Sequence, residues 1–240
     1  MAENQQEKKK SDKAFIWTVL IVALFIVALI TNGFGLFDGN QDNPGTTSNA
    51  KLSIGLSPVL GADNASVTIY IFSDFSCPYC AAAAGKNLEV IAQLQSQSPG
   101  WTAPIPGVIE NYVKAGKAKI IWKYYPGHGT AQNAQKIAWC LSDQNLFWQF
   151  HDKAFENSED TADYNKMKSL ALGLGANEEA LDKCISDKKY DFMFQEDLIM
   201  GRTAEITGTP TFFIVFPSGK VTKVEGAQPY SVFENILSRN

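Results

Sequence analysis

Histidine and cysteine are scarce in this 240-residue chain, which contains two histidines and four cysteines. His128 and His151 are isolated, and the cysteines supply one Cys-x-x-Cys pair, whereas a structural zinc site commonly uses two such ligand pairs. The chain has 21 basic and 25 acidic residues, so it lacks the basic excess of nucleic-acid-binding proteins. The sequence therefore predicts no metal site, no cofactor and no nucleic-acid partner.

Charge is also absent from residues 14–30, which read AFIWTVLIVALFIVALI. With the residues that follow, this stretch is long enough for a helix to cross a hydrocarbon core of about 30 Å. Lysines precede it and Asp38 and Asp42 follow it, so the positive-inside rule places the N-terminus in the cytoplasm. A cleaved signal peptide is the alternative, but no clear small-x-small cleavage site follows Ile30. We predict a single-pass signal anchor in the cell membrane at residues 14–36, with the rest of the chain extracytoplasmic.

The predicted anchor divides the chain into segments of different composition. Residues 1–13 form a polar, lysine-rich cytoplasmic tail. Residues 37–50 are rich in Asp, Asn, Gly and Thr, as expected of a linker that cannot bury a core. The remaining residues, 51–240, have a length that suits one folded domain.

Within this domain, strand and helix patterns follow one another in an α/β order. Residues rich in β-branched and aromatic side chains predict strands at 66–72, 119–125, 211–216 and 221–226. Helix formers predict one helix at 81–95, a short helix after 108 and a final helix at 229–239. The proline-rich residues 96–107 are expected to form a surface loop, with a substrate groove as the alternative. Residues 130–206 show helical patterns only, which predicts a helical insertion in an α/β core.

Cys77 and Cys80 lie at the junction between a predicted strand and a predicted helix, separated by Pro78 and Tyr79. Backbone N–H groups at a helix start stabilise a thiolate and lower its pKa, which favours Cys77 as the nucleophile. Cys80 is one turn further on, close enough to attack a mixed disulfide formed on Cys77. A purely structural disulfide is disfavoured because so short a loop removes little unfolded-state entropy. The spacing predicts a redox pair.

Three segments together resemble the DsbA-like thiol-disulfide oxidoreductases of the thioredoxin superfamily. They are SDFSCPYC, GHGTAQNAQKIAWCLSDQNLFWQFHDKAFEN and TGTPTFFIV, and the resemblance covers the chain from about residue 57 onward. It implies a thioredoxin fold with a helical subdomain inserted at about residues 130–206. It also implies that Pro210 follows a cis peptide bond and faces the cysteine pair, and that Thr209 offers backbone groups to an extended substrate peptide.

The chain departs from this family beside the cysteine pair. Many members carry a buried acidic residue six positions before the first cysteine, and Ile71 stands there in this chain. Asp74 is nearer the pair and has two alternative roles, helping to move the proton of the second thiol or capping the turn; the cap is favoured. Tyr79 replaces the histidine of the most strongly oxidising members, so we expect a less oxidising pair.

Cys140 and Cys184 fall on the apolar faces of two predicted helices. In an oxidising compartment, with the other pair committed to redox chemistry, we expect them to form a structural disulfide. The closed loop would contribute roughly 4 kcal/mol in the chain-entropy model. Inert buried thiols and a second redox pair are the alternatives.

The function predicted from the sequence is that of a membrane-anchored, extracytoplasmic protein thiol-disulfide oxidoreductase. We expect it to form disulfide bonds in exported proteins that contain cysteines, and a membrane quinone-linked thiol oxidase to reoxidise it. A disulfide reductase or isomerase is one alternative. A peptide-binding or chaperone module without catalysis is another.

Overall fold

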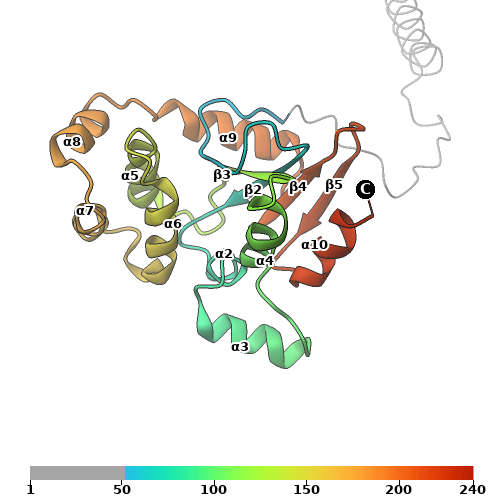
Figure 1. The fold of residues 1–240 in the computed structure, drawn as a ribbon. Helices are drawn as coiled ribbons and strands as arrows, with labels where there is room; N and C mark the ends of the chain where they lie inside the picture. The colour runs from blue at the N-terminus through green and yellow to red at the C-terminus, as the bar shows by residue number, and fades with distance from the viewer. Residues whose placement is uncertain (1–51, 240) are drawn as a thin grey trace, which may run out of the picture. The chain divides into compact units, whose positions relative to one another are not determined.

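The computed structural model describes residues 52–239 of the chain (Figure 1). The strands are β1 (Val59–Leu60), β2 (Val67–Ser73), β3 (Ala118–Tyr124), β4 (Thr211–Val215) and β5 (Val221–Glu225). The helices are α2 (Pro78–Ala83), α3 (Leu88–Gln97), α4 (Pro104–Val108), the π-helical turn η1 (Ile109–Val113), α5 (Gln132–Ser142), α6 (Phe147–Glu156), the 3-10 turn η2 (Ser158–Asp160), α7 (Tyr164–Gly173), α8 (Glu178–Ser186), α9 (Phe192–Thr203) and α10 (Tyr230–Leu237). Helices α5 to α9 separate β3 from β4, which is the predicted order of an α/β core with a helical insertion.

The predicted tail, anchor and linker at residues 1–13, 14–36 and 37–50 lie outside the described residues. Among the helices of residues 52–239, none has the length and apolar character that crossing a membrane requires.

The five strands form one sheet in the order β1-β3-β2-β4-β5. At the centre, β2 runs parallel to β3 and antiparallel to β4. Its β-branched and aromatic residues suit a strand that is paired on both sides and largely buried. The Cys-x-x-Cys turn follows the C-terminal end of β2, so the turn starts from the strand that the sheet holds on both edges.

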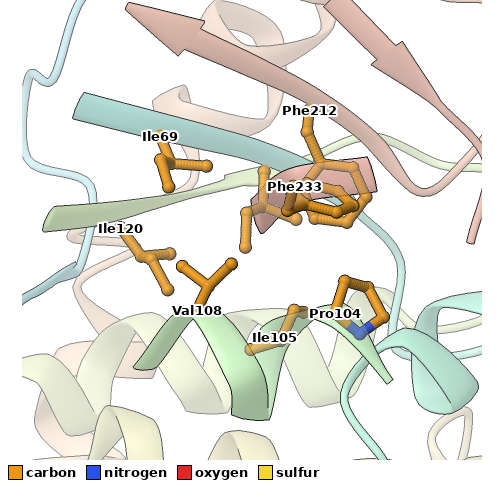
Figure 2. Close-up of a pocket in the computed structure, with 8 residues that line it drawn as sticks. Ile69, Pro104, Ile105, Val108, Ile120, Phe212 and Phe233 are labelled. Carbon is orange, nitrogen blue, oxygen red and sulfur yellow. The ribbon is translucent and has the colours of Figure 1, made fainter. Parts of the chain in front are cut away.

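Alternate residues of the central strands point to opposite faces of the sheet. On one face, apolar side chains of β2, β3 and β4 pack against α4 and α10 (Figure 2). A cavity of about 10 Å³ remains between these layers, lined by Ile69, Ile71, Pro104, Ile105, Val108, Ile120, Phe212 and Phe233. Because this lining is apolar, the cavity offers a water molecule no hydrogen-bond partner. On the other face, Tyr70 and Phe72 of β2 pack with Met200 of α9 and with Ile206.

An aromatic cluster joins the sheet to the helical insertion. The rings of Phe75 and Trp122 stack with centroids 4.8 Å apart, and Phe147 and Phe155 of α6 pack against them. The Trp122 indole N–H donates a hydrogen bond to Gln135 Oε1 of α5 at 3.1 Å. The aromatic residues of α6 therefore belong to the core, as their helical spacing indicates.

A buried ion pair fixes the end of β3 to α9. Lys123 Nζ lies 3.1 Å from Asp197 Oδ1, and both side chains are almost fully buried. The second carboxylate oxygen of Asp197 accepts a hydrogen bond from the backbone N–H of Tyr124 at 2.8 Å. These contacts fix the point from which residues 125–130 leave the sheet.

Two predictions for residues 81–107 are wrong. The single helix expected at 81–95 is two helices, because Gly85 adopts φ +77° after α2 and Asn87 caps α3 through a hydrogen bond from Val90 N. The expected surface loop at 96–107 contains α4, whose Ile105 is buried against the sheet, and Trp101 is only 2% exposed. Prolines at the start of a helix are tolerated, so the proline-rich composition did not exclude α4. The two-residue strand β1 was not predicted.

Candidate active site

Cys77 is the N-cap residue of α2. Its Sγ accepts a hydrogen bond from the backbone N–H of Cys80 at 3.4 Å, as a capping serine or aspartate oxygen would. Pro78 occupies the first turn of the helix, where no backbone N–H is needed. The sequence Cys-Pro-x-Cys therefore places the first sulfur where α2 has unpaired donors.

The surroundings of Cys77 lower the pKa of its thiol from its ordinary value near 9 to about 6. The hydrogen bond with the Cys80 thiol contributes most, and burial acts in the opposite direction. The Thr209 side chain and the backbone N–H groups of Cys80 and Tyr79 lower the pKa further. At neutral pH, Cys77 of the reduced protein is therefore mostly a thiolate.

Cys80 has the opposite character. It is 1% exposed, and burial together with the neighbouring Cys77 raises its pKa well above the ordinary value. Hydrogen bonds with the Ser73 side chain and the Asp74 backbone oppose this rise. The reduced pair thus consists of one stabilised thiolate and one buried thiol, which is the division of roles that thiol-disulfide exchange requires.

The loop before β4 faces this pair, as the resemblance implied. The Thr209–Pro210 peptide bond is cis, and the protonated Cys77 thiol donates a hydrogen bond to the Thr209 carbonyl oxygen, which lies 3.4 Å from Sγ. The Pro210 carbonyl is held by the backbone N–H of Gly226 at 2.8 Å. The buried Thr209 hydroxyl makes no hydrogen bond to the described residues in the reduced form, so it is available to donate one to a Cys77 thiolate.

Asp74 is fully buried between β2 and α2. One carboxylate oxygen accepts hydrogen bonds from Ser76 N and Ser76 Oγ at 3.0 and 2.8 Å. The other accepts from the backbone N–H groups of His128 and Gly129 at 2.8 and 3.2 Å. The contact with Ser76 is the turn cap favoured from the sequence, whereas the two amides from the loop after β3 were not foreseen.

Ile71 occupies the position where many relatives carry a buried acid. Its side chain lines the apolar cavity between the sheet and helices α4 and α10. This environment would make a carboxylate there costly to ionise. The polar groups that reach Cys80 come instead from Ser73 and from the backbone of Asp74.

A hollow of about 420 Å³ begins beside the cysteine pair. It is lined by Tyr79, Leu94, Gln97, Ser98, Trp101, Thr209, Gly226, Ala227, Gln228 and Pro229. All of these lining residues are uncharged, and Tyr79 at its edge is 42% exposed. Gln97, Ser98 and Trp101 belong to the proline-rich segment, so part of that segment borders the hollow.

Cys140 and Cys184 are joined by a disulfide that links α5 to α8 across 44 residues of sequence. Cys77 and Cys80 are free thiols in the same structure. The pairing is the one expected for a structural staple of the helical insertion.

The two histidines lie apart from the sulfur chemistry. His151 is buried in the aromatic cluster, where burial lowers its pKa and so favours the neutral imidazole. The His128 side chain is exposed, and its backbone N–H binds Asp74. Sequence reasoning missed this backbone contact because any residue except proline can supply an N–H group.

A family model, the DSBA-like thioredoxin domain, matches residues 68–238 of the chain. The chain belongs to this family. The match contains all of β2 except Val67, the cysteine pair, the helical insertion, the Thr209–Pro210 loop and α10, so it covers every part of the site described above.

Two named proteins have sequences similar to this chain. The chain is 25% identical over 166 residues to the Disulfide bond formation protein D of Bacillus subtilis, which covers 65% of this chain and 67% of that protein. It is 24% identical over 159 residues to the Na(+)/H(+) antiporter NhaA 3 of Salinispora tropica, but it spans only 21% of that protein's length. The name of the Bacillus protein supports the predicted enzyme class, a thiol-disulfide oxidoreductase.

Solved structures support the fold. The alpha-DsbA1 protein of Wolbachia pipientis superposes with a TM-score of 0.62 at 20% identity, covering 81% of this chain and 95% of that one. Oxidised BdbD of Bacillus subtilis superposes with a TM-score of 0.60 at 21% identity, covering 78% and 94%. The predicted DsbA-like family and the thioredoxin-like α/β fold with a helical insertion are confirmed.

Proposed function

We propose that this member of the DSBA-like family is an extracytoplasmic oxidant that forms disulfide bonds in exported proteins through Cys77 and Cys80. The observation that carries the proposal is the Cys77 thiol, whose pKa is lowered to about 6 beside a Cys80 thiol whose pKa is raised. A stabilised thiolate lowers the free energy of the reduced pair relative to its disulfide, and this makes the disulfide more oxidising.

The reaction begins with the Cys77–Cys80 disulfide. A substrate thiolate attacks Cys77 Sγ, a bond forms between the substrate and Cys77, and the bond to Cys80 breaks. Cys80 leaves with the electron pair, and the Ser73 side chain and the Asp74 backbone are positioned to stabilise its thiolate. A second substrate thiolate then attacks the substrate sulfur of the mixed disulfide and releases Cys77 as a thiolate.

This exchange moves two electrons from the substrate to the protein and leaves the pair reduced. The low pKa makes Cys77 a good leaving group in the second step, so the mixed disulfide resolves toward the oxidised substrate. To act again, the pair must pass two electrons to another oxidant and give up the proton that Cys80 carries. We assign this role to a membrane quinone-linked thiol oxidase.

Thr209 and Pro210 form the proposed binding edge for the substrate. Proline has no N–H to pair across this edge, and the Thr209 carbonyl already faces Cys77 Sγ. An extended peptide that pairs here would bring its cysteine to Cys77 and continue into the uncharged hollow beside Tyr79. The hollow would accept apolar and amide side chains, which are the kinds of side chain that an unfolded substrate exposes.

The proposed location follows from residues 14–36, which have the length and composition of a signal anchor. Residues 1–13 would lie in the cytoplasm, and residues 37–50 would tether the domain outside. An oxidising compartment is also where a buried structural disulfide such as Cys140–Cys184 persists.

Reoxidation of reduced, denatured ribonuclease tests the reaction. The oxidised protein should restore ribonuclease activity, and Cys77→Ser should abolish this effect because Cys80 then has no partner with which to form the disulfide that accepts the substrate's electrons. The double variant Cys140→Ala/Cys184→Ala is the matched control, since it removes two sulfurs and keeps the reactive pair. Full activity in Cys77→Ser would contradict the mechanism.

Two further assays separate the alternatives. Activity on scrambled ribonuclease alone, with the pair kept reduced, would indicate an isomerase. Suppression of client aggregation that persists in Cys77→Ser/Cys80→Ser would indicate a chaperone module.

A further inference from the structure

Asp74 connects two parts of the site that are far apart in sequence. Its side chain has no exposed surface, and both carboxylate oxygens accept two hydrogen bonds each. A carboxylate offers about four lone-pair positions, so all of them are in use. The geometry leaves Asp74 no vacant position from which to take a proton from a cysteine, and its role must be sought in what it holds.

One carboxylate oxygen organises the start of α2. It accepts from Ser76 N and Ser76 Oγ, and the backbone carbonyl of Asp74 accepts from Cys77 N at 3.0 Å. These bonds fix the turn that presents Cys77.

The other oxygen holds the loop at residues 126–129. The backbone N–H groups of His128 and Gly129 both donate to it, from a position 54 and 55 residues further along the chain. The two amides point at one charged oxygen inside the protein, and hydrogen bonds of this kind are stronger than those between neutral groups.

The same loop packs on Thr209. A Cβ atom added to Gly127 would lie 2.2 Å from Thr209 Oγ1, so the loop backbone lies directly against the Thr209 hydroxyl and a side chain there would force one of the two to move. Thr209 in turn faces Cys77 through its carbonyl oxygen. The contacts form a closed ring that runs from Asp74 through the loop and Thr209 to Cys77 and back to Asp74.

We propose that Asp74 is a positioning residue of the redox site: its carboxylate holds residues 126–129 against Thr209 and so keeps the Thr209 hydroxyl beside the Cys77 thiol. The inference rests on the proposed function, because it assigns to Asp74 the task of keeping Cys77 reactive. Asp74 acts through the loop, and its negative charge is incidental to this task.

The variant Asp74→Ala tells apart two ways in which Asp74 could act on Cys77, by positioning the loop or by its charge. Losing the positioned loop and losing the charge change the pKa of Cys77 in opposite directions. If Asp74 acts through the loop, Thr209 moves away, a contact that lowers the pKa is lost, and the pH midpoint for alkylation of Cys77 rises. If Asp74 acts through its charge, removing a nearby anion favours the thiolate and the midpoint falls. Hydrogen exchange at the amides of His128 and Gly129 should also become faster, by roughly tenfold or more, because both lose a buried charged acceptor.

A second variant keeps the test valid if Asp74→Ala does not fold. Gly127→Ala leaves Asp74 unchanged and pushes the loop away from Thr209 Oγ1, so it should produce the same faster exchange and the same rise in the alkylation midpoint. Adding Thr209→Ala to Gly127→Ala removes the clashing oxygen and should restore the protection of the loop amides. Asp143→Asn is the matched control, since Asp143 accepts hydrogen bonds from Lys189 and Tyr190 within the helical insertion and should leave both measurements at wild-type values.

Any of three results would overturn the proposal: unchanged exchange at both loop amides, faster exchange without a change at Cys77, or a lower alkylation midpoint. Both measurements use the reduced protein without substrate. A protein that failed to oxidise ribonuclease but showed the expected changes would therefore refute the proposed function and leave the role of Asp74 as a holder of the loop.

Discussion

Cys77 and Cys80 lie three residues apart at the start of one helix, whereas Cys140 and Cys184 lie 44 residues apart on two helices of the insertion. All four are buried, with exposed fractions between 1% and 7%. Burial therefore does not separate the proposed redox pair from the disulfide-bonded pair.

The difference lies in the hydrogen-bond donors around each sulfur. Cys77 caps α2 and receives donors from the backbone and from Thr209, so its thiolate is stabilised. Cys140 and Cys184 lie within helices, where backbone N–H groups are already paired along the helix, and their sulfurs are joined to each other in a disulfide. We propose that the reactivity of a cysteine in this chain follows from its position within its helix.

The largest expected effect that distinguishes the two cysteine pairs is on the free energy of unfolding. Replacing both Cys140 and Cys184 by alanine should lower the free energy of unfolding by roughly 4 kcal/mol, because a cross-link over 44 residues no longer restricts the unfolded chain. Urea denaturation of the oxidised protein measures this loss. The initial rate of ribonuclease oxidation should stay within about twofold of wild type under native conditions, and a large fall in that rate would mean that the second disulfide takes part in electron transfer.

The reactive pair should make stability depend on pH. The folded protein lowers the pKa of Cys77 to about 6, so between that pH and the ordinary value near 9 the unfolded state binds the proton and the folded state does not. The stability of the dithiol form therefore rises with pH across this window, by up to about 1.4 kcal/mol per pH unit, and is lost as pH falls through 6.

Denaturation of the reduced protein at several pH values measures this dependence. The measurement uses the Cys140→Ala/Cys184→Ala variant, which has no structural disulfide for the reductant to break. The same variant with Cys77→Ser added is the reference. A difference between the two that stays flat from pH 6 to pH 9 would show that Cys77 is an ordinary thiol.

The smallest effect concerns the caps. Asn177 caps α8 through a hydrogen bond from Ala180 N at 2.8 Å, the same task that Cys77 performs for α2. Asn177→Ala should lower the free energy of unfolding by about 1 kcal/mol and leave the alkylation profile of Cys77 unchanged. A shift in that profile would show that the two regions are coupled and that the contrast between them is incomplete.

The sequence predicted those parts of the fold that have a local signal. The β-branched run that became β2 and the helix formers of the insertion were found from their patterns, and the strand-to-helix junction placed Cys77 at a helix start. The cis bond before Pro210 came from the family resemblance, because a proline before a strand is ordinarily trans.

Other parts have no such signal. The two-residue strand β1 is too short for any periodicity, and Gly85 ends α2 through a backbone angle that helix propensity alone does not reveal. The loop amides that bind Asp74 depend on a backbone contact across 54 residues. No side-chain pattern marks such a contact, so the neighbours of Asp74 in the loop after β3 could be identified only in three dimensions.

The distance between Cys77 and Thr209 along the chain has a consequence for biosynthesis. The two residues touch, yet 132 positions separate them. A ribosome adds roughly 5–20 residues per second, so Cys77 is made about 7–26 s before Thr209 exists. Throughout that interval the nascent chain presents Cys77 without Thr209, one of the groups that lower its pKa, and this contact forms only when the C-terminal hairpin joins the sheet.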